Sequence, residues 1–150
     1  MADEPGSIDD SQPRAGAPGA GGNLPSVLAV LDAQRAFYEA FESRSMEAMD
    51  AAWEHSGDVV CTHPGWQTLV GWPAVRDSWA SLLANSEHLQ FIVTDEYVTV
   101  RGDMAYVRVQ ENILAAGAMQ GSLTALNIFG RQGDGSWRML AHHGSPVMLG

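Results

Sequence analysis

The stretch AYVRVQENI, residues 105–113, decides the fold of this 150-residue chain because its side chains alternate in character. Residues two apart in a β-strand share one face of the sheet. One face of this stretch is apolar apart from a single acid, Glu111. Its other members are Ala105, Val107, Val109 and Ile113. The pattern predicts a strand that packs on a core and carries one carboxylate into it.

Strand patterns continue on both sides of this stretch. Upstream, residues 91–100 read as one strand or a bent strand pair, followed by a tight turn at 101–103. Downstream, the expected elements are a loop at 115–121, a strand at 122–131, a hairpin turn at 132–135 and a last strand at 137–145. The second half of the chain is therefore predicted to be an antiparallel meander.

The first half of the chain has helical periodicity instead. Apolar residues recur every three to four positions over 25–43, a second helix follows Ser45, and Pro73 stands in the first turn of a third. A short strand is expected at 58–63, closed by the turn at 64–65. Helices followed by a meander predict an α+β fold, with the helices packed on one face of a strongly bent antiparallel sheet.

Composition sets the domain limits and the classes of partner. Residues 1–23 consist mainly of Gly, Pro, Ala and Asp, so we expect a disordered tail before one domain at 24–150. The net charge of −10 argues against a nucleic-acid partner. No stretch approaches the roughly 20 apolar residues of a membrane span. With the lone Cys61 and no secretory pattern, a cytoplasmic location is expected.

Strand register predicts which polar side chains meet in the sheet. A hairpin centred near residue 119 places Glu111 opposite Asn127, and one centred near 135 places Asn127 opposite His143. On this register the three side chains lie side by side on the concave face, while His142 points away. Glu111 needs a partner there, because burying an unpaired charge costs several kcal/mol.

Further candidates follow from position. His63 ends the short strand, where it is either a general base or a histidine hydrogen-bonded to the turn. Trp66 and Trp72 come next and are expected at a pocket mouth. Phe129 shares a strand face with Asn127.

Several motifs resemble the SnoaL-like branch of the nuclear transport factor 2-like superfamily, over about residues 25–148. They are CTHPGW (61–66), LVGWPAVRDSW (69–79), GDMAYV (102–107) and HHGSP (142–146). The resemblance implies a cone-shaped sheet wrapped around the N-terminal helices, with a deep pocket between them. It also implies a homodimer that pairs through the outer face of the sheet.

The resemblance extends to ketosteroid-isomerase-like enzymes and polyketide cyclases. In the isomerases a carboxylate base precedes the turn after the first strand, and His63 occupies the similar place here. Their first-helix tyrosine, an oxyanion donor, corresponds to Phe37, with Tyr38 beside it. The superfamily therefore implies a small-molecule pocket in which Tyr38 is a candidate contact.

These observations predict an enzyme that isomerises, cyclises, dehydrates or hydrates a small, largely apolar molecule by proton transfer. His63 would act as base or acid, Glu111 and His143 as a second pair, and Asn127 would position the substrate. No glycine-rich phosphate loop appears, so no organic cofactor is expected. One alternative is a binding or assembly module without turnover. Another is a metal site made of His63, His143 and Glu111.

Overall fold

The computed structural model describes residues 20–85 and 87–148. The predicted tail at 1–23 falls largely outside them, since residues 1–19 are not described. Two of its residues, Ala20–Gly21, form the short strand β1, which pairs in parallel with strand β4, Leu89–Arg101. The domain predicted at 24–150 begins with a helix at its first residue.

Three helices form where the periodicity predicts them. Helix α1 spans Leu24–Ser43, and its N-cap Asn23 accepts a hydrogen bond from the Ser26 N–H. Helix α2 spans Met46–Ala52, capped by Ser45. Helix α3 spans Trp72–Asn85 and holds Pro73 in its first turn, where a missing N–H costs nothing.

Seven strands form one open, curved sheet in the order β1-β4-β5-β6-β7-β2-β3. The remaining strands are β2 Val60–Thr62, β3 Leu69–Val70, β4 Leu89–Arg101, β5 Met104–Ala115, β6 Ala118–Arg131 and β7 Trp137–Pro146. Strands β4 to β7 form the predicted antiparallel meander, whereas the pairs β1–β4 and β2–β7 are parallel. The sheet is therefore mixed at its two ends.

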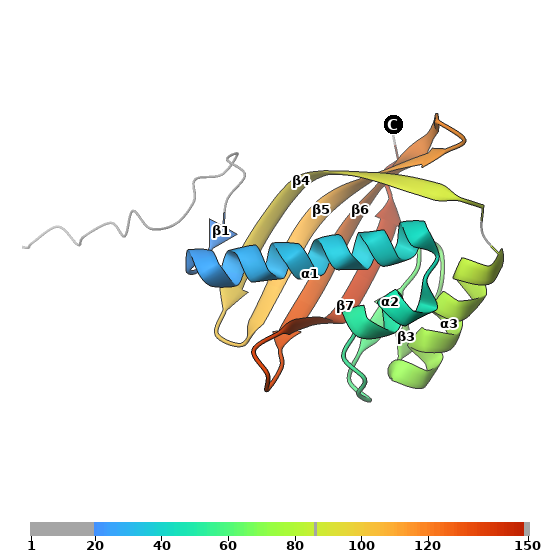
Figure 1. Ribbon diagram of the computed structural model, residues 1–150. Coiled ribbons are helices and arrows are strands. Elements are labelled where there is room, and N and C mark those ends of the chain that lie inside the picture. The colour runs from blue at the N-terminus through green and yellow to red at the C-terminus, as the bar shows by residue number, and fades with distance from the viewer. Residues whose placement is uncertain (1–19, 86, 149–150) are drawn as a thin grey trace, which may run out of the picture.

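Helix α1 crosses the concave face of the meander, and α2 and α3 lie towards β2 and β3 (Figure 1). The space between α1 and the sheet holds the core. Phe37 of α1 and Trp79 of α3 are fully buried, with edge-to-face rings 5.5 Å apart. Burying each such side chain contributes about 1.5–3 kcal/mol, which fixes α1 and α3 against the sheet. Within the described residues, no helix is long and apolar enough to cross a membrane.

A β-bulge in β7 shows that the predicted facing of the two histidines is wrong. Ile128 pairs with Ala141 but Phe129 pairs with Met139, so Leu140 is an extra residue in β7. An extra residue exchanges the two faces of the strand beyond it. His142 is consequently buried on the concave face and pairs with Asn127, whereas His143 is exposed.

The predicted loop at 115–121 is also wrong. Strand β5 continues to Ala115 and β6 begins at Ala118, so the turn consists of Ala116 and Gly117, with φ of 51° and 77°. Two consecutive positive φ angles define a tight hairpin whose twist suits its strands. The hairpin centre therefore moves towards residue 117. Glu111 pairs with Leu123, and Asn127 pairs with Val107, so Glu111 and Asn127 are not directly opposed.

Candidate functional site

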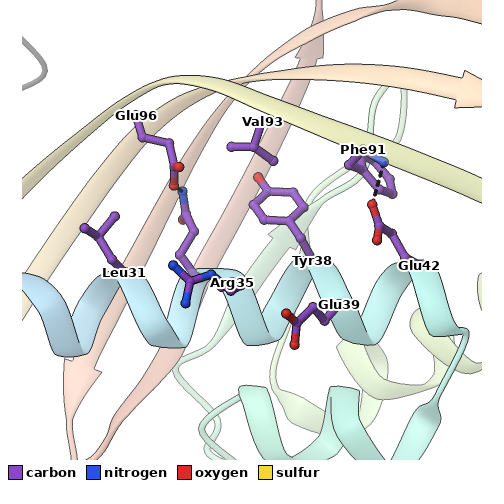
Figure 2. Close-up of a pocket in the computed structure, with 9 residues that line it drawn as sticks. Leu31, Arg35, Tyr38, Glu39, Glu42, Phe91, Val93 and Glu96 are labelled. Atoms are coloured by element: carbon purple, nitrogen blue, oxygen red, sulfur yellow. Dashed lines mark hydrogen bonds between the residues drawn. The ribbon is translucent and has the colours of Figure 1, made fainter.

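A pocket of about 360 Å³ lies between α1 and β4. Its walls are Leu31, Gln34, Arg35, Tyr38, Glu39, Glu42, Phe91, Val93 and Glu96. Figure 2 shows Tyr38 pointing from α1 towards β4, with its hydroxyl near Val93. The walls combine apolar side chains with carboxylates, and the volume suits a small molecule.

The bend of β4 brings Glu96 to this pocket. The register of β4 on β5 shifts between Thr94 and Tyr97, and Asp95 has a left-handed φ of 53°. The bulge turns Glu96 towards α1 (Figure 2). Its Oε2 accepts a hydrogen bond of 2.9 Å from Gln34 Nε2. Gln34 itself is 1% exposed, so this hydrogen bond connects the pocket wall to the core.

A buried hydrogen-bond network continues inward from Gln34. Asn127 Nδ2 donates to Gln34 Oε1 at 2.9 Å and to the Tyr38 hydroxyl oxygen at 3.1 Å. Asn127 Oδ1 lies 2.6 Å from His142 Nδ1, which donates to it. Asn127 is completely buried. The network therefore joins α1, β6 and β7 through side chains that are almost completely buried.

Glu111 lies beside this network, behind the pocket wall. It is 2% exposed, and its neighbour on the adjacent strand β4 is Val93, which lines the pocket. Burial raises its pKa to about 7, and a hydrogen bond from Tyr38 partly offsets that rise. Its Oε1 has no hydrogen-bond partner among the described residues. Glu111 can therefore gain or lose a proton near neutral pH, and its Oε1 is available to bind that proton.

Tyr38 and His142 keep fixed protonation states around it. Burial and the neighbouring Glu111 raise the pKa of Tyr38, so its hydroxyl remains a hydrogen-bond donor. Burial lowers the pKa of His142 to about 3, which leaves a neutral imidazole. Its ring packs on Phe37, with centroids 5.0 Å apart. At neutral pH, Glu111 is thus the group in this network whose charge can change.

His63 is placed elsewhere, between β2 and α3. Its Nε2 lies 2.9 Å from Ser78 Oγ, and that hydroxyl already donates its proton to the Val75 carbonyl at 2.7 Å. Ser78 must therefore accept from His63 Nε2–H. Burial lowers the pKa of His63 to about 4. The residue is neutral, held by α3, and not part of the α1–β4 pocket.

The other predicted contacts are dispersed. Trp66 is 45% exposed and covers His63, with ring centroids 4.8 Å apart, while Trp72 stacks on His55. Phe129 is fully buried in the core. Of the four aromatic residues predicted to contact a ligand, Tyr38 lines the α1–β4 pocket and these three do not.

The predicted metal ligands are also not assembled. His143 lies on the exposed side of β7, away from buried Glu111 and His63. Among residues 20–85 and 87–148, no group of three His, Cys, Asp or Glu side chains is arranged to hold a metal. The two-histidine, one-carboxylate arrangement therefore does not form in this fold.

Sequence reasoning missed Gln34, Glu96 and the inward role of His142. Gln34 was detectable, because it stands four residues before Tyr38 in the buried stripe of α1. A polar residue among apolar ones is the same pattern that identified Glu111. The positions of Glu96 and His142 depend on the bulges in β4 and β7, which no alternation pattern predicts.

Comparison with known proteins gives consistent results. A model of the SnoaL-like domain matches residues 30–149. A solved candidate dehydratase from the NTF2-like family of Streptomyces avermitilis is 39% identical, with a TM-score of 0.77, over 83% of this chain and 98% of that one. No curated protein matches the chain.

Two further solved structures are similar. A candidate calcium/calmodulin-dependent protein kinase type II association domain from Thiobacillus denitrificans is 32% identical, with a TM-score of 0.72, over 77% of this chain and 93% of that one. A candidate aromatic ring hydroxylase from Novosphingobium aromaticivorans shares the fold at 21% identity and a TM-score of 0.65, over 81% and 89% of the chains. The chain belongs to the SnoaL-like domain family, with the α+β cone of NTF2-like proteins.

Proposed function

We propose that this protein is an enzyme that moves a proton within a small molecule bound between α1 and β4. The observation that supports this most is Glu111, a buried carboxyl group with a pKa of about 7 and an oxygen that has no hydrogen-bond partner among the described residues. Burying such a group costs stability, and groups with strongly shifted pKa values cluster at functional sites. His63 is left out of the proposal because it lies between β2 and α3, hydrogen-bonded to Ser78. Glu111, in contrast, adjoins the pocket through its neighbours Tyr38 and Val93, which line it.

The chemistry follows from the two forms of Glu111. The ionised carboxylate removes a proton from a carbon next to a carbonyl group of the substrate, and becomes a carboxylic acid. It then returns that proton to another carbon, which completes an isomerisation, or to a departing hydroxyl, which completes a dehydration. Burial raises the pKa of Glu111, and the hydrogen bond from Tyr38 partly offsets that rise, so both forms of the carboxyl group are available near neutral pH. Each step uses the chain's own residues, without an organic cofactor.

The pocket walls suggest the class of substrate. Leu31, Phe91 and Val93 supply apolar contacts. The cation in the wall, Arg35, forms an ion pair with Asp32 at 3.4 Å, and carboxylates stand near it. A carboxylate or phosphate group would be repelled there, so the substrate is small, largely apolar and uncharged. The name of the 39% identical relative, a candidate dehydratase, supports dehydration as one outcome.

The test uses proton removal itself, which needs no natural substrate. The compound 2-tetralone is a neutral, apolar ketone whose protons next to the carbonyl exchange with deuterium from D₂O, and NMR follows that exchange. Wild-type protein should accelerate exchange above the buffer rate, with activity rising through pH 7, whereas Glu111→Gln should not. Exchange at the buffer rate in wild type would contradict the proposal.

A second candidate function, an assembly module, is supported by the outer face of the sheet. This face exposes large apolar side chains, namely Ile92, Met104, Tyr106 and Leu126, each 41–51% exposed. A groove of about 290 Å³ with an apolar lining runs among the last three. Contiguous exposed apolar surface favours a partner. The 32% identical relative is named as an association domain. We therefore propose a homodimer that pairs through this face.

Leu126→Asp is expected to convert the dimer into a monomer, because it places a charge at the centre of the apolar face. Sedimentation velocity at micromolar concentration measures the change in mass. Leu28→Asp is the matched control, since Leu28 is 52% exposed on α1, away from the outer face. A wild-type protein that sediments as a monomer would reject this assembly.

Location is the remaining proposal. Cys61 is buried and forms no disulfide. Unpaired cysteines are typical of reducing compartments. We place the protein in the cytoplasm.

A further inference from the structure

The hydrogen bonds from Glu96 to His142 have only one consistent direction. A carboxylate can only accept hydrogen bonds, so Gln34 must turn its Nε2 towards Glu96 Oε2. Gln34 Oε1 is then the atom that faces Asn127, and it accepts a hydrogen bond from Asn127 Nδ2. Each amide thus fixes the orientation of the next one.

The same constraint reaches the two residues beyond Asn127. With Nδ2 turned towards α1, Asn127 presents Oδ1 to His142, which must therefore carry its proton on Nδ1. Asn127 Nδ2 also donates to the Tyr38 oxygen. The single hydroxyl proton of Tyr38 is consequently free for Glu111.

We propose that Glu96 is a positioning residue, which acts through Gln34 and Asn127 to direct the Tyr38 hydroxyl at Glu111 and to hold His142 as its Nδ1–H tautomer. The proposal deepens the proposed function, because Tyr38 and Glu111 form its reactive pair. Glu96 lines the pocket and His142 is buried, so the relay runs from the ligand side to the core.

Neutralising Glu96 removes the constraint. A glutamine at position 96 can donate as well as accept, so Gln34 and Asn127 can both rotate by half a turn. In the reversed arrangement Asn127 Oδ1 accepts a hydrogen bond from the Tyr38 hydroxyl, and Asn127 Nδ2 donates one to an unprotonated His142 Nδ1. Glu111 then loses its hydrogen bond from Tyr38, and its pKa rises.

The experiment compares Glu96→Gln with Glu39→Gln. Glu39 lines the same pocket on α1, and within the described residues it makes no hydrogen bond to Gln34, so its variant removes a charge and leaves the relay intact. Two-bond ¹H–¹⁵N NMR of the His142 ring identifies the protonated nitrogen. We expect Nδ1–H alone in wild type and Glu39→Gln, and a second, Nε2–H form in Glu96→Gln.

The pH profile of 2-tetralone exchange should shift in opposite directions in the two variants, or shift in Glu96→Gln alone. Loss of the hydrogen bond from Tyr38 to the ionised carboxylate should move the Glu111 inflection in Glu96→Gln upward by about 1–2 pH units. Removing a negative charge alone lowers the pKa of a neighbouring acid, so Glu39→Gln should show no shift or a downward one.

Gln34→Leu supplies a second variant that interrupts the relay from within and should also release the Nε2–H form. The proposal would be overturned if Glu96→Gln kept the wild-type His142 tautomer and the wild-type pH profile of exchange. It would also be overturned if Glu39→Gln changed both of them as much as Glu96→Gln does. If wild type fails to exchange 2-tetralone, the proposed function fails, while the tautomer measurement still decides the relay.

Discussion

Glu111→Gln is expected to lower the rate of proton removal from 2-tetralone by about 100- to 10,000-fold, the usual contribution of a general base. The amide matches the carboxyl group in shape but cannot accept a proton near neutral pH. Binding of the ketone should change little, because the amide keeps the shape of the carboxyl group and the residues that line the pocket are unchanged. The effect should therefore appear in kcat rather than in KM.

The same substitution should make the protein more stable above pH 7. The pKa of Glu111 is about 7 in the folded protein against an ordinary value of 4.5. The folded state therefore binds more protons between these values, and stability falls as pH rises through that window. At pH 8 the ionised group costs about 3 kcal/mol, which glutamine removes. Thermal unfolding at pH 5 and pH 8 measures the difference.

A matched control separates burial from charge. Glu47→Gln removes an exposed carboxylate on α2, outside the pocket, and should leave both kcat and the pH dependence of stability nearly unchanged. Loss of activity together with a gain in stability at pH 8 would identify Glu111 as a group kept for function. A Glu111→Gln protein that is fully active, or less stable at pH 8, would contradict this account.

Asn127→Ala is expected to destabilise the protein by about 3–6 kcal/mol. The substitution leaves Gln34 Oε1, the Tyr38 hydroxyl and His142 Nδ1–H without their shared partner. Asn127 is completely buried, and each unsatisfied buried group costs about 1–3 kcal/mol. Urea unfolding measures the loss. The loss of unfolding free energy in Asn127→Ala should far exceed the loss caused by a surface substitution on the same strand.

Thr124→Ala provides that comparison, because Thr124 is exposed on β6 and should change stability by less than about 0.5 kcal/mol. A double variant with Gln34→Ala tests whether the network acts as a unit. The two losses should not add, since each substitution already breaks the Gln34–Asn127 hydrogen bond. Simple additivity, or a loss below about 1 kcal/mol for Asn127→Ala, would show that the network contributes little.

The sequence predicted the elements well because each one depends on local periodicity. The stripe of α1 and the alternation of β5 are regular, so the burial of Glu111 among Val107 and Val109 followed from sequence and is confirmed. The fold class was predictable for the same reason, since helices followed by a meander have few ways to pack. The family resemblance pointed to the same architecture.

The arrangement of the site was less predictable because it depends on single-residue irregularities. One extra residue at Leu140 exchanges His142 and His143, and the left-handed Asp95 turns Glu96 into the pocket. Ala116 adopts a positive φ that its residue type does not suggest, which moved the expected partner of Glu111. The bulges in β4 and β7 each shift the register by one residue, so alternation rules lose the facing beyond them.

The protonation of Glu111 is the most direct test of the central claim. Infrared difference spectra between pH 5 and pH 9, recorded for wild type and Glu111→Gln, isolate the carbonyl stretch of this one buried acid. The account predicts a carboxylic-acid band that titrates near pH 7 and is missing from the variant. A band that has already disappeared by pH 5 would show that Glu111 is an ordinary carboxylate and would contradict the proposed mechanism.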